Sequence, residues 1–365
     1  MTRRVETKHM ERGRIAIAGA GIVGLACAFE LYRRGHEITL FDAASPTEST
    51  SWAAAGMIAP AYEVMLHRGG AKTPLARFCF ESAALWPEFA EALRVETGIP
   101  FGYARAPTLA IARNDKEADR LVTLKKSLIA AGHICHWRHG QALPGSLGAS
   151  SEVQAALELP DDHQVDNRHL IHALRSLCDS ESFRFVRAVV NTQEEMERYA
   201  GNSFDAIIWA RGAHEVGIDS IVKGQALALY PVAGVPEQVL RFGAGYIVPK
   251  PDRVIIGATS EETYSHTGVS QKATKALFEE AVAILPILSK AKIMEVWTGL
   301  RPRRGNGVPL IGSIGENEYV AAGLHRNGVL LAPATARRVA DLVEGKPSAI
   351  DAEAFAPSGN MDATA

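Results

Sequence analysis

The stretch RIAIAGAGIVGLACAFELYRRGHEITLFD, which spans residues 14–42, decides the fold of this chain of 365 residues. Residues 14–18 have the short apolar pattern of a buried strand, and residues 37–42 have the pattern of a second strand. Between them, residues 22–34 have the length and composition of a helix, which Gly35 ends. This order predicts a β-α-β unit whose two strands lie in a parallel sheet.

The turn between the first strand and the helix carries a G-x-G-x-x-G motif. Gly19 permits the tight turn, Gly21 lets backbone amides approach a pyrophosphate, and Gly24 lets the helix pack on the strand. The helix N-terminus favours phosphate, and Asp42 can accept hydrogen bonds from ribose hydroxyls. Alternatively, the glycines serve only packing and Asp42 is a solvated strand end. The motif predicts a dinucleotide site formed by Gly19, Ala20, Gly21, Ile22, Val23, Gly24 and Asp42.

A loop rich in hydroxyl groups and small side chains, STSWAAAGM at residues 49–57, follows the second strand. Its hydroxyls can bind phosphate or ribitol oxygens, and its small residues let a flat ring lie against the backbone. The glycine motif is common to NAD and FAD sites, whereas this loop favours FAD. Composition alone also allows an ordinary alanine-rich packing turn. We expect cofactor contacts from Thr50, Ser51, Ala55, Gly56 and Met57.

The charge balance argues against nucleic acid and anionic membrane as partners. The chain has 39 basic and 41 acidic residues and a formal net charge of −2. Its four cysteines form no CxxC pair, which fits a reducing compartment, and no metal site is expected. Residues 15–31, after Arg3-Arg4, resemble a signal peptide, but the glycines in this run favour the dinucleotide turn. No other run approaches the roughly 20 apolar residues of a membrane span, so we expect a cytoplasmic protein.

Further along the chain, helical patterns alternate with short apolar runs. Helices are predicted at residues 75–97, 116–131 and 273–285, after an N-cap at Asp166, and up to about residue 343. Strands are predicted at residues 183–190, 205–210, 293–299 and 319–322. Short strands separated by Pro and Gly, which favour an antiparallel sheet, are predicted at residues 225–230, 238–242, 246–249 and 254–258.

These patterns predict an α/β fold with two domains that are discontinuous in sequence. One is a Rossmann-like, FAD-binding domain with a parallel sheet, and the other is an α+β substrate domain with a largely antiparallel sheet. We assign residues 12–85, 151–222 and 296–345 to the FAD-binding domain. We assign residues 86–150 and 223–295 to the substrate domain. The ends, residues 1–11 and 351–365, are expected to be flexible.

Three later segments carry a resemblance to a known family. They are GYIVP at 245–249, VWTGLRP at 296–302 and, most specifically, RNGVLLAPAT at 326–335. Together with the loop at 49–57, they resemble the glycine oxidase branch of the D-amino-acid oxidase-like flavoproteins, which includes the glycine oxidases of thiamine biosynthesis. The resemblance implies FAD in a glutathione-reductase-type domain. It also implies non-covalent binding, because the cysteine or histidine that attaches the flavin in some relatives is missing here.

The resemblance implies roles for residues in these segments. Arg301 matches the family arginine that holds the substrate carboxylate, and a guanidinium can do so through two parallel hydrogen bonds. Tyr246 matches a tyrosine whose phenol points at the substrate, and Arg326 is expected to reach the active site. From the residues alone, Arg301 can equally be a surface arginine beside Arg303 and Arg304, and Tyr246 can be a core tyrosine.

The loop before the last helix is expected to hold the flavin ring. Its helix N-terminus would aim N–H groups at the flavin N1 and C2 carbonyl, although it can also be a simply capped helix start. Leu324 and His325 replace the histidine and aromatic residue that the family often has, and Ser260 replaces a methionine of some members. Further cofactor contacts are expected from Val189, Leu324, His325, Arg326, Asn327, Gly328, Val329 and Leu330.

The resemblance implies oxidation of glycine, sarcosine, D-alanine or another small amine or amino acid. Hydride would pass from the substrate Cα–H to the flavin, the imine would hydrolyse to a 2-oxo acid and ammonia, and dioxygen would give hydrogen peroxide. No histidine is expected to act as a base if the amine binds neutral. The alternatives are a flavin-dependent amino acid dehydrogenase with a non-oxygen acceptor and a non-catalytic dinucleotide-binding protein. Expected partners are thiazole-synthesis enzymes and further copies of the chain in a homo-oligomer.

Overall fold

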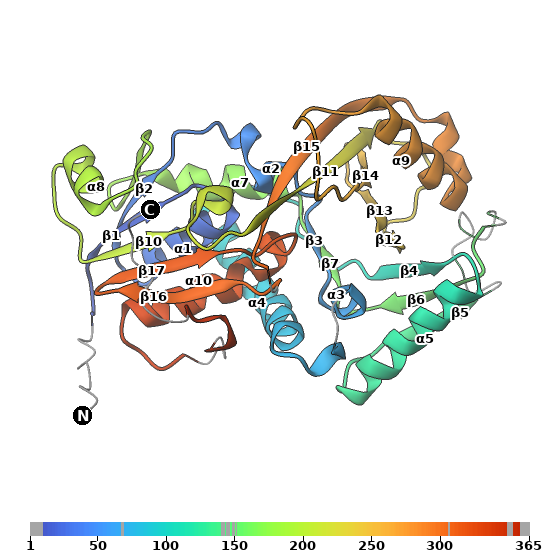
Figure 1. Ribbon diagram of the computed structural model, residues 1–365, viewed down its shortest axis with the longest axis horizontal. Coiled ribbons are helices and arrows are strands. Elements are labelled where there is room, and N and C mark those ends of the chain that lie inside the picture. The colour runs from blue at the N-terminus through green and yellow to red at the C-terminus, as the bar shows by residue number, and fades with distance from the viewer. Residues whose placement is uncertain are drawn as a thin grey trace.

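Two β-sheets lie side by side in the computed structural model of this chain (Figure 1). The structure describes residues 10–66, 69–139, 143, 147, 150, 152–305, 307–348 and 353–357. The sheet that carries the predicted dinucleotide turn is at the left of Figure 1, and the second sheet extends to the right. Two long strands, β11 (Ser220–Leu229) and β15 (Ile293–Arg303), run from the middle of the molecule into the second sheet.

The first sheet has seven strands and contains the predicted β-α-β unit. Its order is β16 (Leu310–Gly315), β17 (Glu318–Ala322), β10 (Ala206–Trp209), β1 (Arg14–Ala18), β2 (Glu37–Phe41), β9 (Phe183–Val186) and β8 (Asp179–Ser180). The strands from β17 to β9 are parallel, and the two edge strands, β16 and β8, are antiparallel to their neighbours. The predicted parallel sheet is confirmed.

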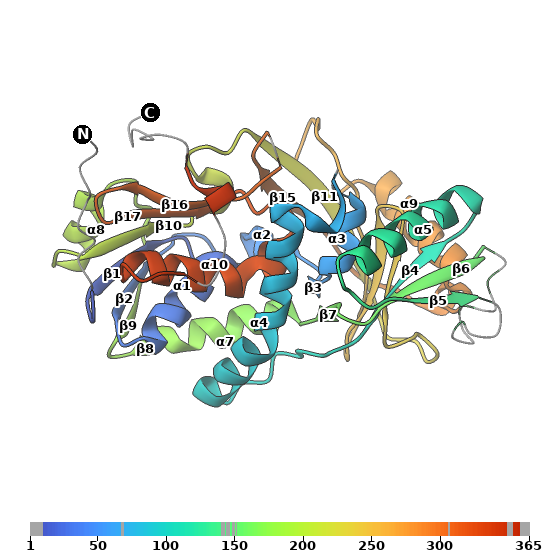
Figure 2. The same cartoon turned by 90° about the horizontal axis from the view of Figure 1, so that it is seen from below.

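Helices cover both faces of this sheet because successive side chains of a strand point to opposite sides. Ile15 and Ile17 of β1 point into the larger core, where α1 (Ile22–Arg33) packs against α10 (Gly328–Val343) (Figure 2). Helices α4 (Pro74–Thr97) and α7 (Asn167–Arg175) complete that core. Ala16 and Ala18 point into a smaller core with Met196 of α8 (Gln193–Ala200).

The second sheet has eight strands and is largely antiparallel, as predicted. Its order is β15, β11, β14 (Val254–Gly257), β13 (Gly245–Pro249), β12 (Val239–Phe242), β4 (Thr108–Ala112), β6 (Ala155–Leu159) and β5 (His136–His139). The pairing of β12 with β4 is parallel, and the other pairs are antiparallel. Helices α5 (Asp115–Ala130) and α9 (Gln271–Ile284) pack on this sheet.

The structure corrects the predicted strands in several places. Strand β15 runs on to Arg303, so Arg301 lies within a strand rather than after it, because β15 pairs with β11 along its whole length. Strands β4, β5, β6 and β16 are absent from the prediction. β6 joins the second sheet, although the sequence assigns residues 151–222 to the first domain. The predicted boundary after residue 85 falls inside α4. We therefore propose a division that follows the sheets.

The loop at 49–57 crosses from the first sheet to the second. It forms the short helix α2 (Thr50–Ala53) and the strand β3 (Met57–Ile58), which pairs with β7 (His163–Gln164). Helix α3 (Pro60–Leu66) follows. These short elements place the loop between the two sheets.

Few of the terminal residues lie within the described ranges. Of residues 351–365, the part described includes Phe355, which is buried and lies 4.9 Å from the ring of Phe78. Among the helices that the structure describes, none is long and apolar enough to cross a membrane. The four cysteines are free thiols.

Candidate active site

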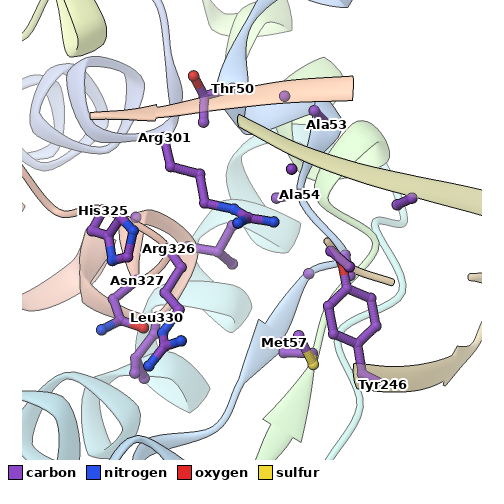
Figure 3. A pocket seen from close by; sticks show the side chains of 18 of the residues that line it. Thr50, Ala53, Ala54, Met57, Tyr246, Arg301, His325, Arg326, Asn327 and Leu330 are labelled. Carbon is purple, nitrogen blue, oxygen red and sulfur yellow. The ribbon is translucent and has the colours of Figure 1, made fainter. Parts of the chain in front are cut away.

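A pocket with about 1190 Å³ of empty space lies where the loop at 49–57, the face of the second sheet and the start of α10 meet (Figure 3). Of the predicted site residues, it collects Ile22, Thr50, Ser51, Ala55, Gly56, Met57, Tyr246, Arg301, His325, Arg326, Asn327, Gly328, Val329 and Leu330. Segments that are far apart in sequence therefore share one cavity.

The glycine turn has the geometry that a dinucleotide site needs. Gly19 has φ +103°, and a Cβ there would lie 2.2 Å from the carbonyl oxygen of Ala210. A Cβ on Gly24 would lie 1.9 Å from the carbonyl oxygen of Gly19. Gly21 precedes α1. A Cβ on Gly21 would meet no backbone atom, and the atom nearest to it would be the hydroxyl oxygen of Ser51 at 3.4 Å. Gly19 and Gly24 thus serve packing, and Gly21 leaves the helix N-terminus accessible.

Asp42 links the glycine turn to the end of β2. Its two carboxylate oxygens accept hydrogen bonds from the backbone N–H of Ala20 at 2.7 Å and of Ala44 at 2.8 Å. Each oxygen keeps a lone pair that can accept a further hydrogen bond, as a ribose hydroxyl would require. Val189 lies beyond β9 and is 66% exposed. It does not line the pocket, so its contact with the cofactor stays a prediction.

Hydrogen bonds fix the loop at 49–57 on two sides. The Ser51 hydroxyl accepts a hydrogen bond from the N–H of Ile22, the first residue of α1, at 2.9 Å. The Thr50 hydroxyl donates to the carbonyl oxygen of Leu300 in β15. The indole N–H of Trp297, also in β15, donates to the carbonyl oxygen of Ala53 at 2.9 Å. The loop is therefore held against both the dinucleotide turn and the substrate sheet.

Asn167 is a residue of this region that the sequence analysis missed. It is fully buried at the start of α7, and its side-chain amide donates to the carbonyl oxygens of Ser51 and Trp52 at 2.8 and 3.0 Å. Its neighbour Asp166 is the predicted N-cap, and this prediction is confirmed. The only signal for Asn167 was its place directly after this N-cap.

The start of α10 forms the opposite wall of the pocket. His325 has φ +51°, and its buried Nε2 has no hydrogen-bond partner among the described residues. Burial and the nearby Arg326 and Arg301 lower the pKa of His325 to about 4, so its ring is neutral near pH 7. The Arg326 guanidinium pairs with the buried carboxylate of Glu63 at 3.0 Å. Glu63, from α3, is a pocket residue that the sequence analysis did not single out.

Arg301 and Tyr246 point into the same space from the second sheet (Figure 3). The Arg301 side chain lies over Gly224, where a Cβ would clash with its guanidinium, and it donates to the carbonyl oxygen of Thr259 at 3.2 Å. Burial lowers the pKa of Arg301. Within the described residues, no carboxylate forms an ion pair with Arg301, which is therefore a partly buried cation without an anionic partner. Arg301 thus lines the pocket.

The phenol of Tyr246 lies over Gly257, where a Cβ would be 2.4 Å from the hydroxyl oxygen. Burial raises the pKa of Tyr246, and the charges of Arg301 and Arg241 oppose this rise. No hydrogen bond to the Tyr246 hydroxyl is found in the part of the chain that the structure describes. The hydroxyl is thus available to a ligand between Tyr246 and Arg301.

Arg241 is a third arginine that lines the pocket and that the sequence analysis missed. It stands in β12 and is only 5% exposed. The guanidinium carbon lies 4.0 Å from the centre of the Tyr62 ring, and Nη1 lies 3.4 Å from the Met57 sulfur. The sequence signal for Arg241 is a charged residue within the apolar strand VLRF. Burying a charge costs free energy unless it is compensated, so such a residue indicates a functional site.

The residues present fit a flavin dinucleotide. The accessible start of α1 suits a pyrophosphate. The small side chains of Ala53 and Ala54 leave room for a flat ring, and the start of α10 faces the same cavity. The unpartnered Nε2 of His325 offers one further polar contact. No group of three His, Cys, Asp or Glu that could hold a metal ion is found among the described residues.

Comparisons with known proteins agree with this fit. The DAO family model, described as FAD dependent oxidoreductase, matches residues 14–342. The chain is 32% identical to the glycine oxidase of Geobacillus kaustophilus, over 93% of this chain and 95% of that protein. It is 30% identical to the bifunctional protein ThiO/ThiG of Trichormus variabilis, over 90% of this chain and 52% of that protein. The crystal structure of the Geobacillus kaustophilus glycine oxidase superposes with a TM-score of 0.85 at 29% identity, covering 96% of this chain and 99% of that one.

Proposed function

The chain belongs to the DAO family of FAD-dependent oxidoreductases, and on this premise we propose that it oxidises the C–N bond of a small amino acid or amine. The candidate substrates are glycine, sarcosine and D-alanine. The relatives that support this proposal include the glycine oxidase of Geobacillus kaustophilus. We also propose that FAD binds non-covalently, to the dinucleotide turn, the loop at 49–57 and the residues from Leu324 to Leu330.

The observation that carries this proposal is the unpaired guanidinium of Arg301. A buried cation is stable only when an anion or several hydrogen bonds compensate for its lost hydration. Arg301 has one carbonyl partner, Thr259, and otherwise faces the pocket. An amino acid carboxylate supplies two acceptor oxygens in the planar geometry that a guanidinium matches. We therefore assign the substrate carboxylate to Arg301.

Tyr246 and Arg301 together orient the substrate. The Tyr246 hydroxyl can donate to the same carboxylate, which fixes the amino acid at two points and directs its Cα–H toward the flavin. Such orientation contributes several kcal/mol to catalysis. Arg326 is held by Glu63, so we assign it a role at the edge of the pocket rather than a direct contact with the carboxylate.

The flavin, when bound, supplies the redox chemistry by accepting a hydride from the substrate Cα–H. The resulting imine hydrolyses to a 2-oxo acid and ammonia, or methylamine when the substrate is sarcosine, and dioxygen takes up the two electrons as hydrogen peroxide. The residues of the chain need not remove a proton if the substrate amine binds neutral. His325 does not fit the role of a base, because a pKa of about 4 is far from the operating pH.

The test of the proposal begins with the purified protein and FAD. We expect a yellow protein that glycine, sarcosine or D-alanine bleaches under nitrogen and that forms hydrogen peroxide in air. Arg301→Met should raise the KM for these substrates on the order of 100-fold, since a buried charge pair is lost. The matched control is Arg303→Met in the same strand, because Arg303 pairs with Glu262 outside the pocket. A colourless protein, or a yellow one that no amine bleaches, would support the non-catalytic alternative.

The electron acceptor needs a separate experiment. The enzyme would be reduced by glycine under nitrogen and then mixed with air-saturated buffer. Rapid return of the oxidised spectrum is expected of an oxidase, whereas slow return would favour a dehydrogenase that uses another acceptor. The bifunctional relative ThiO/ThiG supports our proposal that the chain acts beside a thiazole-synthesis enzyme. We further propose that the chain forms a homo-oligomer and that it is cytoplasmic.

A further inference from the structure

We propose that Arg241 forms a second anion-binding subsite in this pocket, so that the preferred substrate is a small amino acid with a second carboxylate. The inference rests on the proposed function, because it concerns the far end of the same substrate pocket. It goes beyond that function by naming a substrate class, and it assigns a role to a residue that the proposed reaction does not use.

The register of the second sheet places Arg241 beside the substrate-orienting tyrosine. Arg241 in β12 and Tyr246 in β13 are directly opposite each other in the antiparallel pair. Side chains of opposed residues project from the same face of a sheet. Tyr246 in turn is opposite Gly257 of β14, which is opposite Ala226 of β11. Arg241, Tyr246 and Ala226 all line the pocket. This row therefore forms one wall, with Arg241 at its far end.

Arg241 lacks the partner that a buried guanidinium normally has. It is 5% exposed, and within the described part of the chain no carboxylate forms an ion pair or hydrogen bond with it. Its Nη1 contacts the Met57 sulfur, which is a weak acceptor, and its Nε has no hydrogen-bond partner. The Tyr62 ring, 4.0 Å from the guanidinium carbon, compensates for only part of the lost hydration. Donors are thus left over for a ligand.

The acidic groups nearby do not neutralise this wall. Glu63 is engaged by Arg326 at 3.0 Å. Asp162 is fully buried and its charge interacts with Arg241, but the two form no ion pair; Oδ1 of Asp162 instead accepts a hydrogen bond from the backbone N–H of Ala61 at 3.2 Å. Arg301 has no acidic partner either. The substrate end of the pocket therefore carries two guanidinium groups that form no ion pair with a carboxylate in the described part of the chain, and donors remain for a second acidic group.

The two guanidinium groups come from different parts of this wall. The Arg301 side chain reaches over Gly224 in β11, whereas Arg241 stands on β12, three strands further in the sheet order. Three strand spacings correspond to about 14 Å. Hydrogen bonds of about 2.8 Å at each guanidinium take up part of this span. The length of the Arg241 side chain takes up a further part, and a substrate with a few bonds between its two acidic groups can bridge the rest.

The experiment compares pairs of substrates that differ in one carboxylate. Iminodiacetate and sarcosine differ by a carboxylate on the N-substituent, and D-aspartate and D-alanine differ by a carboxylate on the side chain. We expect kcat/KM to be at least 10-fold higher for the dicarboxylate in one pair, and that pair identifies where the second acid is attached. Equal values within both pairs would overturn the inference. A flavin that no amine bleaches would instead overturn the proposed function.

Variants then test whether Arg241 is responsible. Arg241→Met should lower the ratio of kcat/KM for the preferred dicarboxylate over its partner on the order of 100-fold, and Arg241→Lys should restore part of it. Arg113→Met is the matched control. Arg113 also packs against β12, on the ring of Phe242, but it does not line the pocket. If Arg241 had only a structural role, Arg241→Met would lower kcat/KM equally for both substrates. The ratio of the two kcat/KM values would then stay unchanged, and this result would contradict the subsite.

A binding measurement on the wild-type enzyme needs neither turnover nor a variant. Succinate and propionate differ by one carboxylate, and their binding can be followed by the change they cause in the flavin absorbance. We expect succinate to bind at least 10-fold more tightly than propionate at constant ionic strength. Equal affinity of the two ligands would contradict a second anion-binding subsite even if the Arg241 variants do not fold.

Discussion

The side chain of Asn167 donates a hydrogen bond of 2.8 Å to the carbonyl oxygen of Ser51, although the two residues are 116 positions apart. The same amide group donates to the carbonyl oxygen of Trp52 at 3.0 Å. Both carbonyls belong to the loop that we propose to hold the flavin. The conformation of this loop therefore depends on a side chain from α7, and the cofactor site depends on tertiary structure formed far away in sequence.

The first prediction concerns this amide. Asn167→Leu keeps the approximate shape of the side chain but leaves two loop carbonyls without donors, at a cost of about 1–3 kcal/mol. We expect the dissociation constant for FAD to rise on the order of 10-fold, measured by titration of the apoprotein. Asn167→Asp should be at least as damaging, because carboxylate oxygens would face the carbonyl oxygens. An Asp variant with wild-type affinity would show that the amide is not the essential donor.

The second prediction concerns Gly56 in the same loop. Its φ is +73°, and a Cβ there would lie 1.9 Å from the carbonyl oxygen of Val165. Gly56→Ala should therefore combine backbone strain with a clash that the loop must relieve by moving. Gly98→Ala is the control, since Gly98 has φ +66° but nothing within 4 Å of the added Cβ. It should cost about 1–2 kcal/mol of backbone strain alone.

The readouts for these two glycines are the free energy of unfolding and the FAD content of the purified protein. We expect Gly56→Ala to lose more stability than Gly98→Ala and to lose FAD as well. Equal destabilisation of the two variants, with full FAD content in both, would show that the contact with Val165 has no influence on the cofactor site.

The third prediction concerns the pH dependence of stability. Burial raises the pKa of Asp162 from 3.8 to about 7, so between these values the folded protein holds a proton that the unfolded chain has lost. The stabilisation from this proton is fully present below pH 4, falls as the pH rises to 7, and is constant above that. Asn does not titrate. Asp162→Asn should therefore gain stability relative to wild type across this range, by on the order of 4 kcal/mol.

Chemical unfolding at several pH values checks this prediction. Asp161→Asn serves as the control, because the side chain of Asp161 is next in the sequence but is 53% exposed. Parallel stability curves for wild type and Asp162→Asn between pH 4 and 7 would contradict a proton held by Asp162 in the folded state.

The fourth prediction concerns the phenol of Tyr246. Tyr246→Phe removes a hydroxyl that faces the pocket and has no hydrogen-bond partner among the described residues, so the melting temperature should stay the same or rise slightly. The loss of a hydrogen bond to a charged carboxylate costs about 1.5–3 kcal/mol, so kcat/KM should fall about 10- to 100-fold. Steady-state kinetics and thermal unfolding check the two parts. A lower melting temperature with unchanged kcat/KM would make Tyr246 a structural residue only.

The dinucleotide turn could be predicted from sequence because its constraints are local. A strand, three glycines and a helix lie within a few residues of one another, and the φ of Gly19 and the close contact at Gly24 follow from that short segment. The N-cap at Asp166 was predictable for the same reason. Arg301 and Tyr246 were identified through a resemblance, since the residues alone left both a surface and a core interpretation open.

The remaining residues depend on contacts that the local sequence does not contain. Glu63 matters because α3 brings it to Arg326, which is 263 positions away. Arg241 lines the pocket because β12 pairs with β13, and no short motif encodes this pairing. Strands β4 and β6 were missed because their apolar runs are short and are separated by a long helical segment.

The hydrogen bonds of Thr50 with Leu300 and of Trp297 with Ala53 join the loop at 49–57 to the strand that carries Arg301. A shift of one of these elements must displace the other, so the separation between cofactor ring and carboxylate anchor is built as a fixed unit. On β12 the loop is contacted through the Met57 sulfur, a weak acceptor for Arg241, so a substitution there disturbs the carboxylate anchor less. The carboxylate anchor would thus stand on the edge strand β15, and the residues that set substrate selectivity on the interior strands β12 and β13 of the same sheet.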